Sequence, residues 1–377
     1  MTQDQPIMGQ LHSDKEPQIN KYFHLVIKID ASDLHMKVNM VPRIRIRGAL
    51  KNTNATVMTE ARMEELIFEI LTEEQKKYFL RNGALDFAWQ VGRADRFRVN
   101  VFRQRGLISL AARHITSNIP PFEMLHLPTT VEKIAEVHDG LVLVTGPTGC
   151  GKSSTIASMI DHINSNRSCH IVTIEDPIEF LHVDKKAIVS QREIGVDVPT
   201  YEAALRSLMR RDPDVVLVGE IRDNETLTAA MRAAETGHMV FGTLHSVNAS
   251  QTIQRILDLF PQEERELARQ TFALTIRAII SQQLLPGIRE DAKIVPAIEI
   301  LLANPIVRKL ISEGRENDLP NVIRSCQKEG MQDITESLRK LIAEEWVDLK
   351  VGLNHAPNVE ELKMALKGIR GSSSGIL

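Results

Sequence analysis

Apolar and polar positions alternate differently in the first third of the chain and in the rest. Residues 41–47 and 96–101 carry an apolar residue at every second position, as half-buried strands do, whereas the apolar residues of 63–71 recur at helical spacing. A capping box beginning at Thr72 predicts the next helix. These segments predict a small α+β domain over residues 21–118.

The pattern changes after the prolines of Asn118-Ile119-Pro120-Pro121, which neither continue a helix nor donate to a sheet. We expect a domain boundary there and a linker over residues 119–130. Beyond it, short apolar runs alternate with helical segments, and from about residue 305 to Leu366 the chain reads as helices. This alternation predicts an α/β domain over 131–366 with a mainly parallel, covered sheet. Its strands are expected to include residues 141–144, 171–174, 215–218 and 240–241.

Composition narrows the class of protein. The 377 residues are 43% hydrophobic and 25% charged, which excludes a collagen-like or disordered chain. The net charge of −3 argues against stable nucleic-acid binding, and three cysteines are too few for a disulfide framework or a four-cysteine zinc module. The sequence shows neither a signal peptide nor a membrane-spanning run. We expect a cytoplasmic protein, able to dock peripherally on a membrane, with mobile ends at 1–20 and 367–377.

A phosphate-binding loop is indicated between a predicted strand and a predicted helix. Its sequence, Gly146-Pro147-Thr148-Gly149-Cys150-Gly151-Lys152-Ser153, matches the pattern G-x-x-x-x-G-K-[ST]. The glycines let backbone N–H groups converge on phosphate oxygens, and the helix N-terminus adds positive potential. We expect Lys152 to reach the β- and γ-phosphates of ATP and the Ser153 hydroxyl to ligate Mg²⁺. The expected nucleotide-binding residues are Gly146, Pro147, Thr148, Gly149, Cys150, Gly151, Lys152, Ser153 and Ser154.

Cys150 lies inside this loop. A thiol near a helix N-terminus can have a lowered pKa and be reactive. We favour the simpler interpretation, in which a small side chain fills a space in the loop.

Two acidic segments follow predicted strands and are candidates for catalysis. Glu220 ends the third apolar run, in the position of a Walker B acid, where it would lie near Mg²⁺ and the attacking water. Glu175, Asp176 and Glu179 follow the second run, and hydrolysis needs a carboxylate that orients or deprotonates water. Spacing alone does not choose among these three acids.

His238 and His245 flank the fourth predicted strand. Their spacing excludes a helical metal pair of the H-E-x-x-H kind. His245 falls at the C-terminal end of the strand, at the edge of a parallel sheet where ligands usually bind.

Together these segments resemble the secretion ATPase superfamily of type II secretion and type IV pili, and they are most similar to the PilT-type pilus retraction ATPases. The resemblance extends from Ala31-Ser32-Asp33-Leu34-His35 to the C-terminal helices. Four motifs carry it in the right order: the phosphate loop, an Asp box at 173–179, a Walker B segment at 212–223 and a His box at 233–245. It implies a RecA-like P-loop ATPase domain preceded by a PAS-like domain.

The resemblance also implies a role for each site residue. Glu179 is implied to be the base that activates water, and Glu220 to support Mg²⁺ and hydrolysis. The two histidines are implied to sense nucleotide and neighbouring subunits. Arg96, Arg98 and Arg113 are implied to reach the nucleotide from the N-terminal domain, as arginine fingers do. A solvated strand face is the competing interpretation of the first two arginines.

By the same resemblance, the chain is expected to form a homohexameric ring in which ATP binding and release rotate the domains, with the linker at 119–130 as the hinge. The ring would work at the cytoplasmic face of the inner membrane, on a membrane-embedded platform protein. Its expected function is to power pilus retraction and twitching motility by depolymerising pilin.

Retraction is favoured over assembly by two features. Assembly ATPases usually carry extra N-terminal domains and a four-cysteine zinc insertion, and we expect neither here. Retraction ATPases carry the segment Ala-Ile-Arg-Asn-Leu-Ile-Arg-Glu, and residues 306–313 correspond to it. The segment departs from that pattern at Lys309 and Ser312, which leaves a PilU-type accessory role, or a role in assembly or type II secretion, as alternatives. It matches at Arg308, Leu310, Ile311 and Glu313.

Other classes of P-loop protein are less compatible with the sequence. A ring ATPase that translocates nucleic acid needs a basic channel with aromatic side chains, and the balanced charge and 4% aromatic content weigh against it. A nucleotide-binding subunit without catalysis is disfavoured by intact Lys152, Glu179 and Glu220. A small-molecule kinase would leave the Asp and His boxes without a role.

Overall fold

The structure, a computed structural model, describes residues 16–46, 48–92 and 95–368. Its contacts divide the chain into two units, each of which is described by itself. The N-terminal unit contains the residues up to Asn118 together with 177–183 and 193–199, and the C-terminal unit contains 119–176, 184–192 and the residues from Thr200. Two short segments inside the expected ATPase domain therefore belong with the N-terminal unit.

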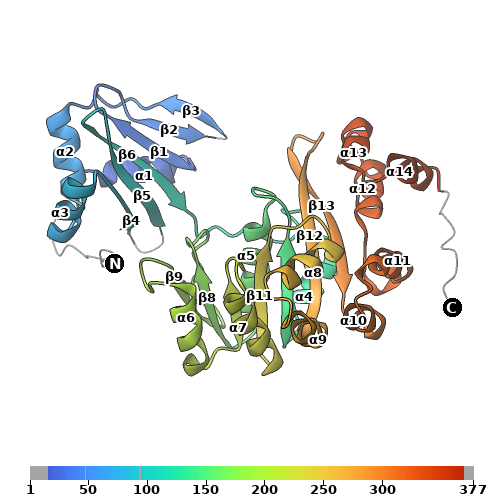
Figure 1. Cartoon of the computed structure of the whole chain (residues 1–377). Coiled ribbons are helices and arrows are strands. Elements are labelled where there is room, and N and C mark those ends of the chain that lie inside the picture. The colour runs from blue at the N-terminus through green and yellow to red at the C-terminus, as the bar shows by residue number, and fades with distance from the viewer. Residues whose placement is uncertain (1–15, 47, 93–94, 369–377) are drawn as a thin grey trace. The chain divides into compact units, whose positions relative to one another are not determined.

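The described residues of the N-terminal unit form a six-stranded antiparallel sheet of order β3-β2-β1-β6-β5-β4 (Figure 1). Helices α1, α2 and α3 share one apolar core with the inward side of these strands. The elements are α1 (Asn20–Lys28), β1 (Asp33–Lys37), β2 (Arg43–Ile46), β3 (Ala49–Asn52), α2 (Glu60–Phe68), α3 (Glu73–Asn82), β4 (Ala84–Val91), β5 (Asp95–Gln104) and β6 (Leu107–Ile115).

The strand and helix patterns predicted for this unit are confirmed, with two corrections. The inward face of β5 is fully buried as predicted, and Thr72 and Gln75 form the reciprocal capping box at the start of α3. Helix α2 ends at Phe68, earlier than the apolar pattern predicts. Ile70 and Leu71 are buried all the same, in the turn that follows the helix. The expectation of a mobile segment up to residue 20 is wrong for its described part, because Ile19 is fully buried at the start of α1. Residues 1–15 and 369–377 of the expected mobile ends lie outside the described residues.

The described residues of the C-terminal unit surround a seven-stranded sheet of order β13-β12-β7-β11-β10-β8-β9. Strands β12, β7, β11, β10 and β8 are parallel, and β13 pairs antiparallel with β12. The elements before the last hairpin are α4 (Thr129–Ala135), β7 (Gly140–Thr145), α5 (Lys152–Asn166), β8 (His170–Glu175), β9 (Ile188–Glu193), α6 (Tyr201–Leu208), β10 (Val215–Val218), α7 (Asn224–Glu235), β11 (Met239–Leu244), α8 (Ala249–Asp258) and α9 (Arg265–Thr275). All four predicted strands are present, which confirms the α/β class.

The sequence pattern did not predict the hairpin of β12 (Ile276–Pro286) and β13 (Ile294–Leu302). Pro296 interrupts the second strand, but β13 lies at the edge of the sheet, where a missing N–H is tolerated. The predicted helical stretch follows, as α10 (Pro305–Ser312), α11 (Leu319–Ser325), α12 (Ile334–Ala343), α13 (Leu349–His355) and α14 (Val359–Leu366). None of the helices in the described ranges has the length and hydropathy needed to cross a bilayer.

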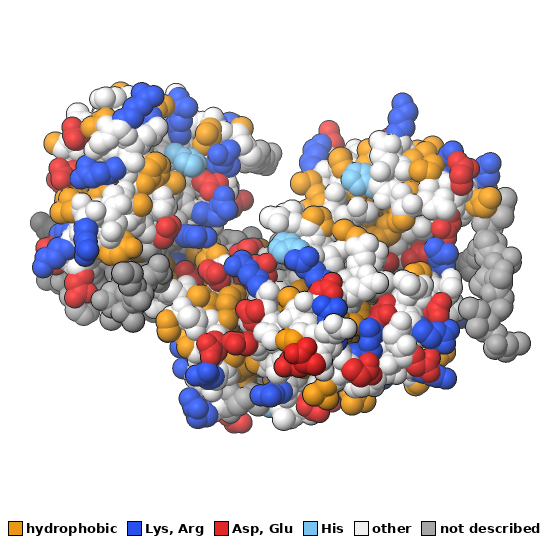
Figure 2. All heavy atoms as spheres, in the orientation of Figure 1, with side chains coloured by type: hydrophobic (Ala, Val, Ile, Leu, Met, Phe, Trp, Pro, Cys, Tyr) orange, Lys and Arg blue, Asp and Glu red, His pale blue; other side chains and the backbone are white. Residues whose placement is uncertain are grey.

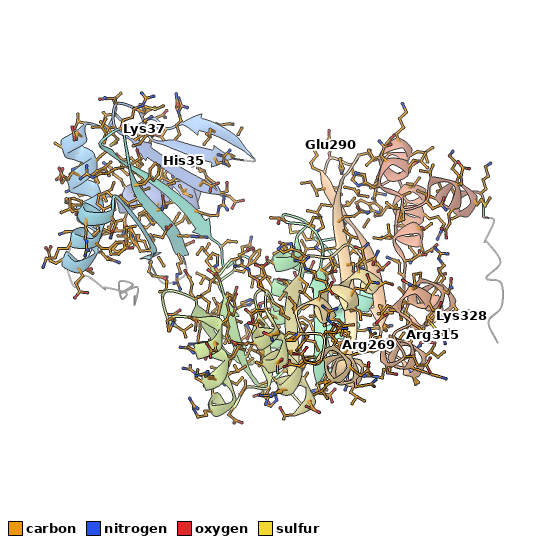
Figure 3. All side chains as sticks on the ribbon, viewed as in Figure 1. His35, Lys37, Arg269, Glu290, Arg315 and Lys328 are labelled. Atoms are coloured by element: carbon orange, nitrogen blue, oxygen red, sulfur yellow. The ribbon has the colours of Figure 1, made fainter. Side chains whose placement is uncertain are left out.

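The retraction-like segment lies on α10, and most of the residues that match the family pattern hold the fold. Arg308 donates to the carbonyl oxygens of Ala273, Leu274 and Ile276 at the end of α9, and Leu310 and Ile311 are buried. Arg269 on α9 adds a hydrogen bond to the Ile311 carbonyl, at 3.0 Å; Figure 3 labels it beside these C-terminal helices. Of the two departures, Lys309 is exposed and Ser312 is half-buried, so neither disturbs this packing.

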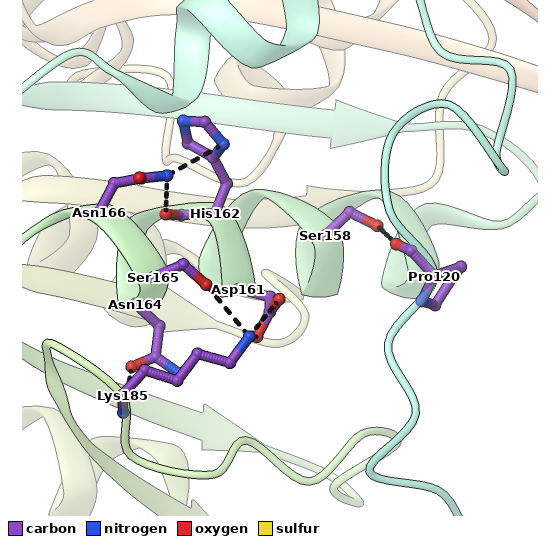
Figure 4. A network of polar contacts seen from close by, with 8 residues as sticks. All are labelled: Pro120, Ser158, Asp161, His162, Asn164, Ser165, Asn166 and Lys185. Atoms are coloured by element: carbon purple, nitrogen blue, oxygen red, sulfur yellow. Dashed lines mark hydrogen bonds and ion pairs between the residues drawn. The ribbon is translucent and has the colours of Figure 1, made fainter.

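Part of the expected linker is held by contacts within the C-terminal unit. Ser158 on α5 donates to the Pro120 carbonyl at 2.6 Å (Figure 4), and Phe122 lies on the ring of His162 and packs against the core of the C-terminal unit. Thr116 is bridged to Phe180 within the N-terminal unit. Pro120 and Phe122 therefore anchor the start of residues 119–130 to the C-terminal unit. The chain also passes between the units at 176–177, 183–184, 192–193 and 199–200, so 119–130 is one of several connections.

Candidate active site

The phosphate loop joins the fully buried strand β7 to the start of α5. Gly146, Gly149 and Gly151 have φ angles of 145°, 77° and 86°, which favour glycine. A Cβ on Gly146 would lie 2.3 Å from the carbonyl oxygen of Gln282 on β12. The loop thus passes so close to β12 that its first position accepts only glycine.

The start of α5 is open to an anion. Its N-cap residue, Gly151, has no side chain to accept from the first backbone N–H groups, which have no partner within the helix. Lys152 Nζ donates to the carbonyl oxygens of Gly146 at 2.9 Å and Pro147 at 3.0 Å, so its ammonium lies over the loop. An uncapped helix N-terminus with an ammonium beside it fits the phosphates of a nucleotide.

We expect Gly146→Ala to weaken ATP binding at least about tenfold, the equivalent of about 1.4 kcal/mol. The new Cβ would press on a backbone atom that cannot rotate away. Titration with a fluorescent ATP analogue measures the effect. Gly83→Ala is the matched control, because its φ is also positive, nothing lies within 4 Å of the added Cβ, and the residue lies outside the phosphate loop, at the end of α3. Equal affinities for the wild type and Gly146→Ala would contradict the geometry of this contact.

Polar residues of β12 support the loop from beneath. The buried Gln282 side chain accepts from Thr155 Oγ1 at 2.9 Å and donates to the Cys150 carbonyl at 2.6 Å. The Ser281 hydroxyl accepts from Thr145 Oγ1 at 2.8 Å. Sequence reasoning missed these supports, because single polar residues inside an apolar strand carry no motif.

The Cys150 thiol faces the interior of the loop. Its side chain is buried, and this burial raises the pKa of the thiol in spite of the nearby Lys152. A raised pKa disfavours the reactive thiolate. The space-filling interpretation is therefore the one that the geometry supports.

Glu220 and His245 meet at the C-terminal edge of the sheet. They follow the adjacent parallel strands β10 and β11, and His245 Nε2 lies 3.1 Å from Glu220 Oε1. Arg222 donates to the other carboxylate oxygen of Glu220. The hydrogen bond from Arg222 is the main cause that holds the pKa of Glu220 below its usual value, so this carboxylate is charged at neutral pH. Sequence reasoning found the first two residues and missed Arg222.

His238 lies at the other end of β11. Its Nδ1 is 2.9 Å from the Ala233 carbonyl and 3.0 Å from Thr236 Oγ1, at the C-terminus of α7. The structure therefore separates His238 from the edge that holds Glu220, and its contacts close a helix end.

The three acids of the Asp box have different surroundings. Glu175 is buried and accepts hydrogen bonds from Thr173 Oγ1 at 2.6 Å and Gln191 Nε2 at 3.1 Å, as a structural residue does. Asp176 is exposed just beyond the end of β8, beside β10. Glu179 is exposed in the segment that belongs to the N-terminal unit, and its role as the base stays a prediction.

The three candidate arginines of the N-terminal unit also differ in their surroundings. Arg96 is buried, with Nη2 3.2 Å from Glu193 Oε2, so a solvated face is the wrong interpretation for this residue. Arg98 and Arg113 are exposed and stand directly opposite each other on β5 and β6. Asp33 accepts from Arg113 at 3.0 Å. Arg113 therefore already has an anionic partner within its own unit, and the role of Arg98 and Arg113 at the nucleotide stays a prediction.

The oxygen donors present fit a nucleotide-bound Mg²⁺. Ser153 lies in the first turn of α5, and Glu220 supplies a carboxylate. Among the residues described, no cluster of three or more His, Cys, Asp or Glu could hold a metal without other ligands. Mg²⁺ commonly binds through one or two protein oxygens, phosphate oxygens and water, which agrees with this sparse set.

Several known proteins are similar to this chain in sequence and in fold. The profile of a family described as Type II/IV secretion system protein matches residues 11–350. The type IV pilus retraction ATPase PilT of Pseudomonas aeruginosa is 41% identical over 316 residues, which cover 84% of this chain and 91% of that protein. The type IV pilus ATPase PilU of the same organism is 34% identical over 351 residues, which cover 93% and 91%. The crystal structure of the pilus retraction motor PilT with bound ADP matches with a TM-score of 0.83 at 41% identity, and the match covers 93% of this chain and 99% of that one. This chain therefore belongs to the type II/IV secretion ATPase family, and its recognition as a PilT-type member is confirmed.

Proposed function

We propose that this chain is an ATP-hydrolysing motor that powers the retraction of type IV pili and thereby twitching motility. The observation that carries the proposal is the open phosphate loop in a fold that matches the ADP-bound retraction motor over almost its whole length. The identity to PilT exceeds the identity to PilU, which supports retraction over the accessory role.

The residues of the phosphate loop and of the acidic edge have separate tasks in hydrolysis. The N–H groups of the loop and Lys152 bind the phosphates of ATP. Mg²⁺, held by Ser153 and Glu220, would offset the phosphate charge. Glu179 orients the attacking water and takes its proton, while Glu220 keeps its negative charge through Arg222. The hydrogen bond between His245 and Glu220 makes the histidine sensitive to changes at the phosphates.

The mechanical cycle uses both units of the chain. Six copies form a ring, and Arg98 and Arg113 reach the nucleotide as positive groups that neutralise developing charge. Hydrolysis and release then rotate the two units against each other. The ring acts on a platform protein at the cytoplasmic face of the inner membrane. Figure 2 shows acidic and basic side chains interspersed on the visible face of each unit, which argues against a nucleic-acid track.

A strain that lacks this gene is expected to carry an excess of surface pili and to lose twitching. Retraction removes pili, so its loss leaves assembled fibres in place. Counting pili by electron microscopy, beside a twitching assay of parent and deletion, measures this. Complementation with the wild-type gene should restore both, and complementation with Lys152→Ala should restore neither. A bald surface would indicate assembly, and unchanged pili an accessory role.

A further inference from the structure

Tyr201 carries a buried hydroxyl that no motif accounts for. The residue begins α6, and its hydroxyl oxygen lies 3.3 Å from the place that a Cβ on Gly219 would take. The same place is 3.1 Å from the Ile174 carbonyl, so the hydroxyl reaches the ends of β8 and β10. Within the described ranges, this oxygen has no hydrogen-bond partner.

The surroundings of this hydroxyl are charged. Burial is the main cause that raises the pKa of Tyr201; Asp176, Glu175 and Glu220 raise it further, and Arg222 opposes them. The phenol is therefore protonated at neutral pH and has a hydrogen to donate. These acids lie at or just beyond the C-terminal ends of the paired strands β8 and β10, which are the strand ends that the hydroxyl reaches.

A hydroxyl without a partner is costly inside a protein, and phenylalanine would fill the same space without that cost. The cost is avoided where a water molecule accepts from the hydroxyl and donates to neighbouring carboxylates. Glu220 is already engaged by Arg222 and His245, whereas Asp176 is exposed beside the same edge. A water that accepts from Tyr201 and donates to Asp176 satisfies both groups.

We propose that Tyr201 is a positioning residue for ATP hydrolysis, whose hydroxyl donates to a water molecule that in turn donates to Asp176, and so orders the water at the edge where the γ-phosphate is cleaved. The inference rests on the proposed ATP hydrolysis and deepens it. Tyr201 neither gives up nor takes a proton. In the reaction, a water oxygen bonds to the γ-phosphorus, the bond to the β–γ bridging oxygen breaks, and the proton of the attacking water passes to the carboxylate base.

Tyr201→Phe removes only the hydroxyl. With purified full-length protein, we expect kcat for ATP hydrolysis to fall about tenfold, the size expected for the loss of one ordinary hydrogen bond. KM and the affinity for a fluorescent ATP analogue should stay within about twofold, because the phosphate loop is untouched. The thermal midpoint should be equal or higher. Tyr22→Phe is the matched control, since Tyr22 is a buried tyrosine in the N-terminal unit, and it should leave kcat unchanged.

The outcomes separate this inference from the proposed function. Unchanged kcat in Tyr201→Phe, with active wild type, would overturn the role of the hydroxyl and leave the ATPase intact. If kcat and the thermal midpoint of Tyr201→Phe both fall, kcat of the variant and of the wild type is compared at two temperatures well below both midpoints. The same ratio of variant to wild-type kcat at both temperatures supports positioning. Recovery of the variant's kcat at the lower temperature overturns it. A wild type that does not hydrolyse ATP would refute the proposed function itself, and the inference with it.

Discussion

Glu220→Gln is expected to reduce ATP turnover by about two to four orders of magnitude while ATP still binds. Glutamine keeps the shape of the side chain but removes the negative charge. Arg222 and His245 both contact this charged carboxylate. Losses of this size are typical when a group that handles protons or charge in the transition state is removed. Phosphate release gives the turnover, and titration with a fluorescent ATP analogue gives the affinity.

The pH dependence follows from the same contacts. Because the hydrogen bond from Arg222 lowers the pKa of Glu220, the charged form persists as the pH falls from neutral toward its ordinary range. The contribution of Glu220 to turnover should therefore be constant between about pH 8 and 5.

Glu175→Gln is the matched control at this edge. Glu175 is buried and engaged by Thr173 and Gln191, and a glutamine oxygen can still accept from both. Turnover should change far less in Glu175→Gln than in Glu220→Gln. If Glu179 is the base, Glu179→Gln should lose turnover to about the same extent as Glu220→Gln. Normal turnover by Glu220→Gln would remove it from the catalytic set, and a large loss in Glu175→Gln alone would move the role to that acid.

The parts of the fold that were predictable are those that local pattern determines. The strand β7 is entirely apolar and is followed by a motif with fixed positions, so both the strand and the phosphate loop could be placed from the sequence. The position of His245 followed from a general property of parallel sheets, in which strand ends gather at one edge.

The missed features depend on contacts between segments far apart in the sequence. The strand β12 carries Ser281 and Gln282 where an apolar pattern would need hydrophobic residues, because these side chains support the phosphate loop. Arg96 alternates like a solvated residue, but Glu193, almost a hundred residues later, covers it. Local sequence rules fail most often where side chains serve a site, and β12 is an example.

Lys152→Ala is expected to weaken ATP binding by about a hundredfold or more, equivalent to about 2.7 kcal/mol, and to abolish turnover. Among the described residues, the hydrogen bonds of its ammonium go only to the loop carbonyl oxygens of Gly146 and Pro147. Its removal takes away a phosphate ligand without opening the core. The thermal midpoint without nucleotide should therefore stay close to that of the wild type.

Lys185 offers a matched control for this change. Its ammonium binds Asp161 and Ser165 on the same helix, α5 (Figure 4), so Lys185→Ala also removes a lysine that contacts this helix. A ligand that binds only the folded protein raises the midpoint according to its concentration and affinity. Saturating ATP should thus stabilise the wild type and Lys185→Ala but leave Lys152→Ala unshifted. An equal ATP-induced shift in all three proteins would mean that the nucleotide binds without Lys152, and the phosphate loop would lose its assigned role.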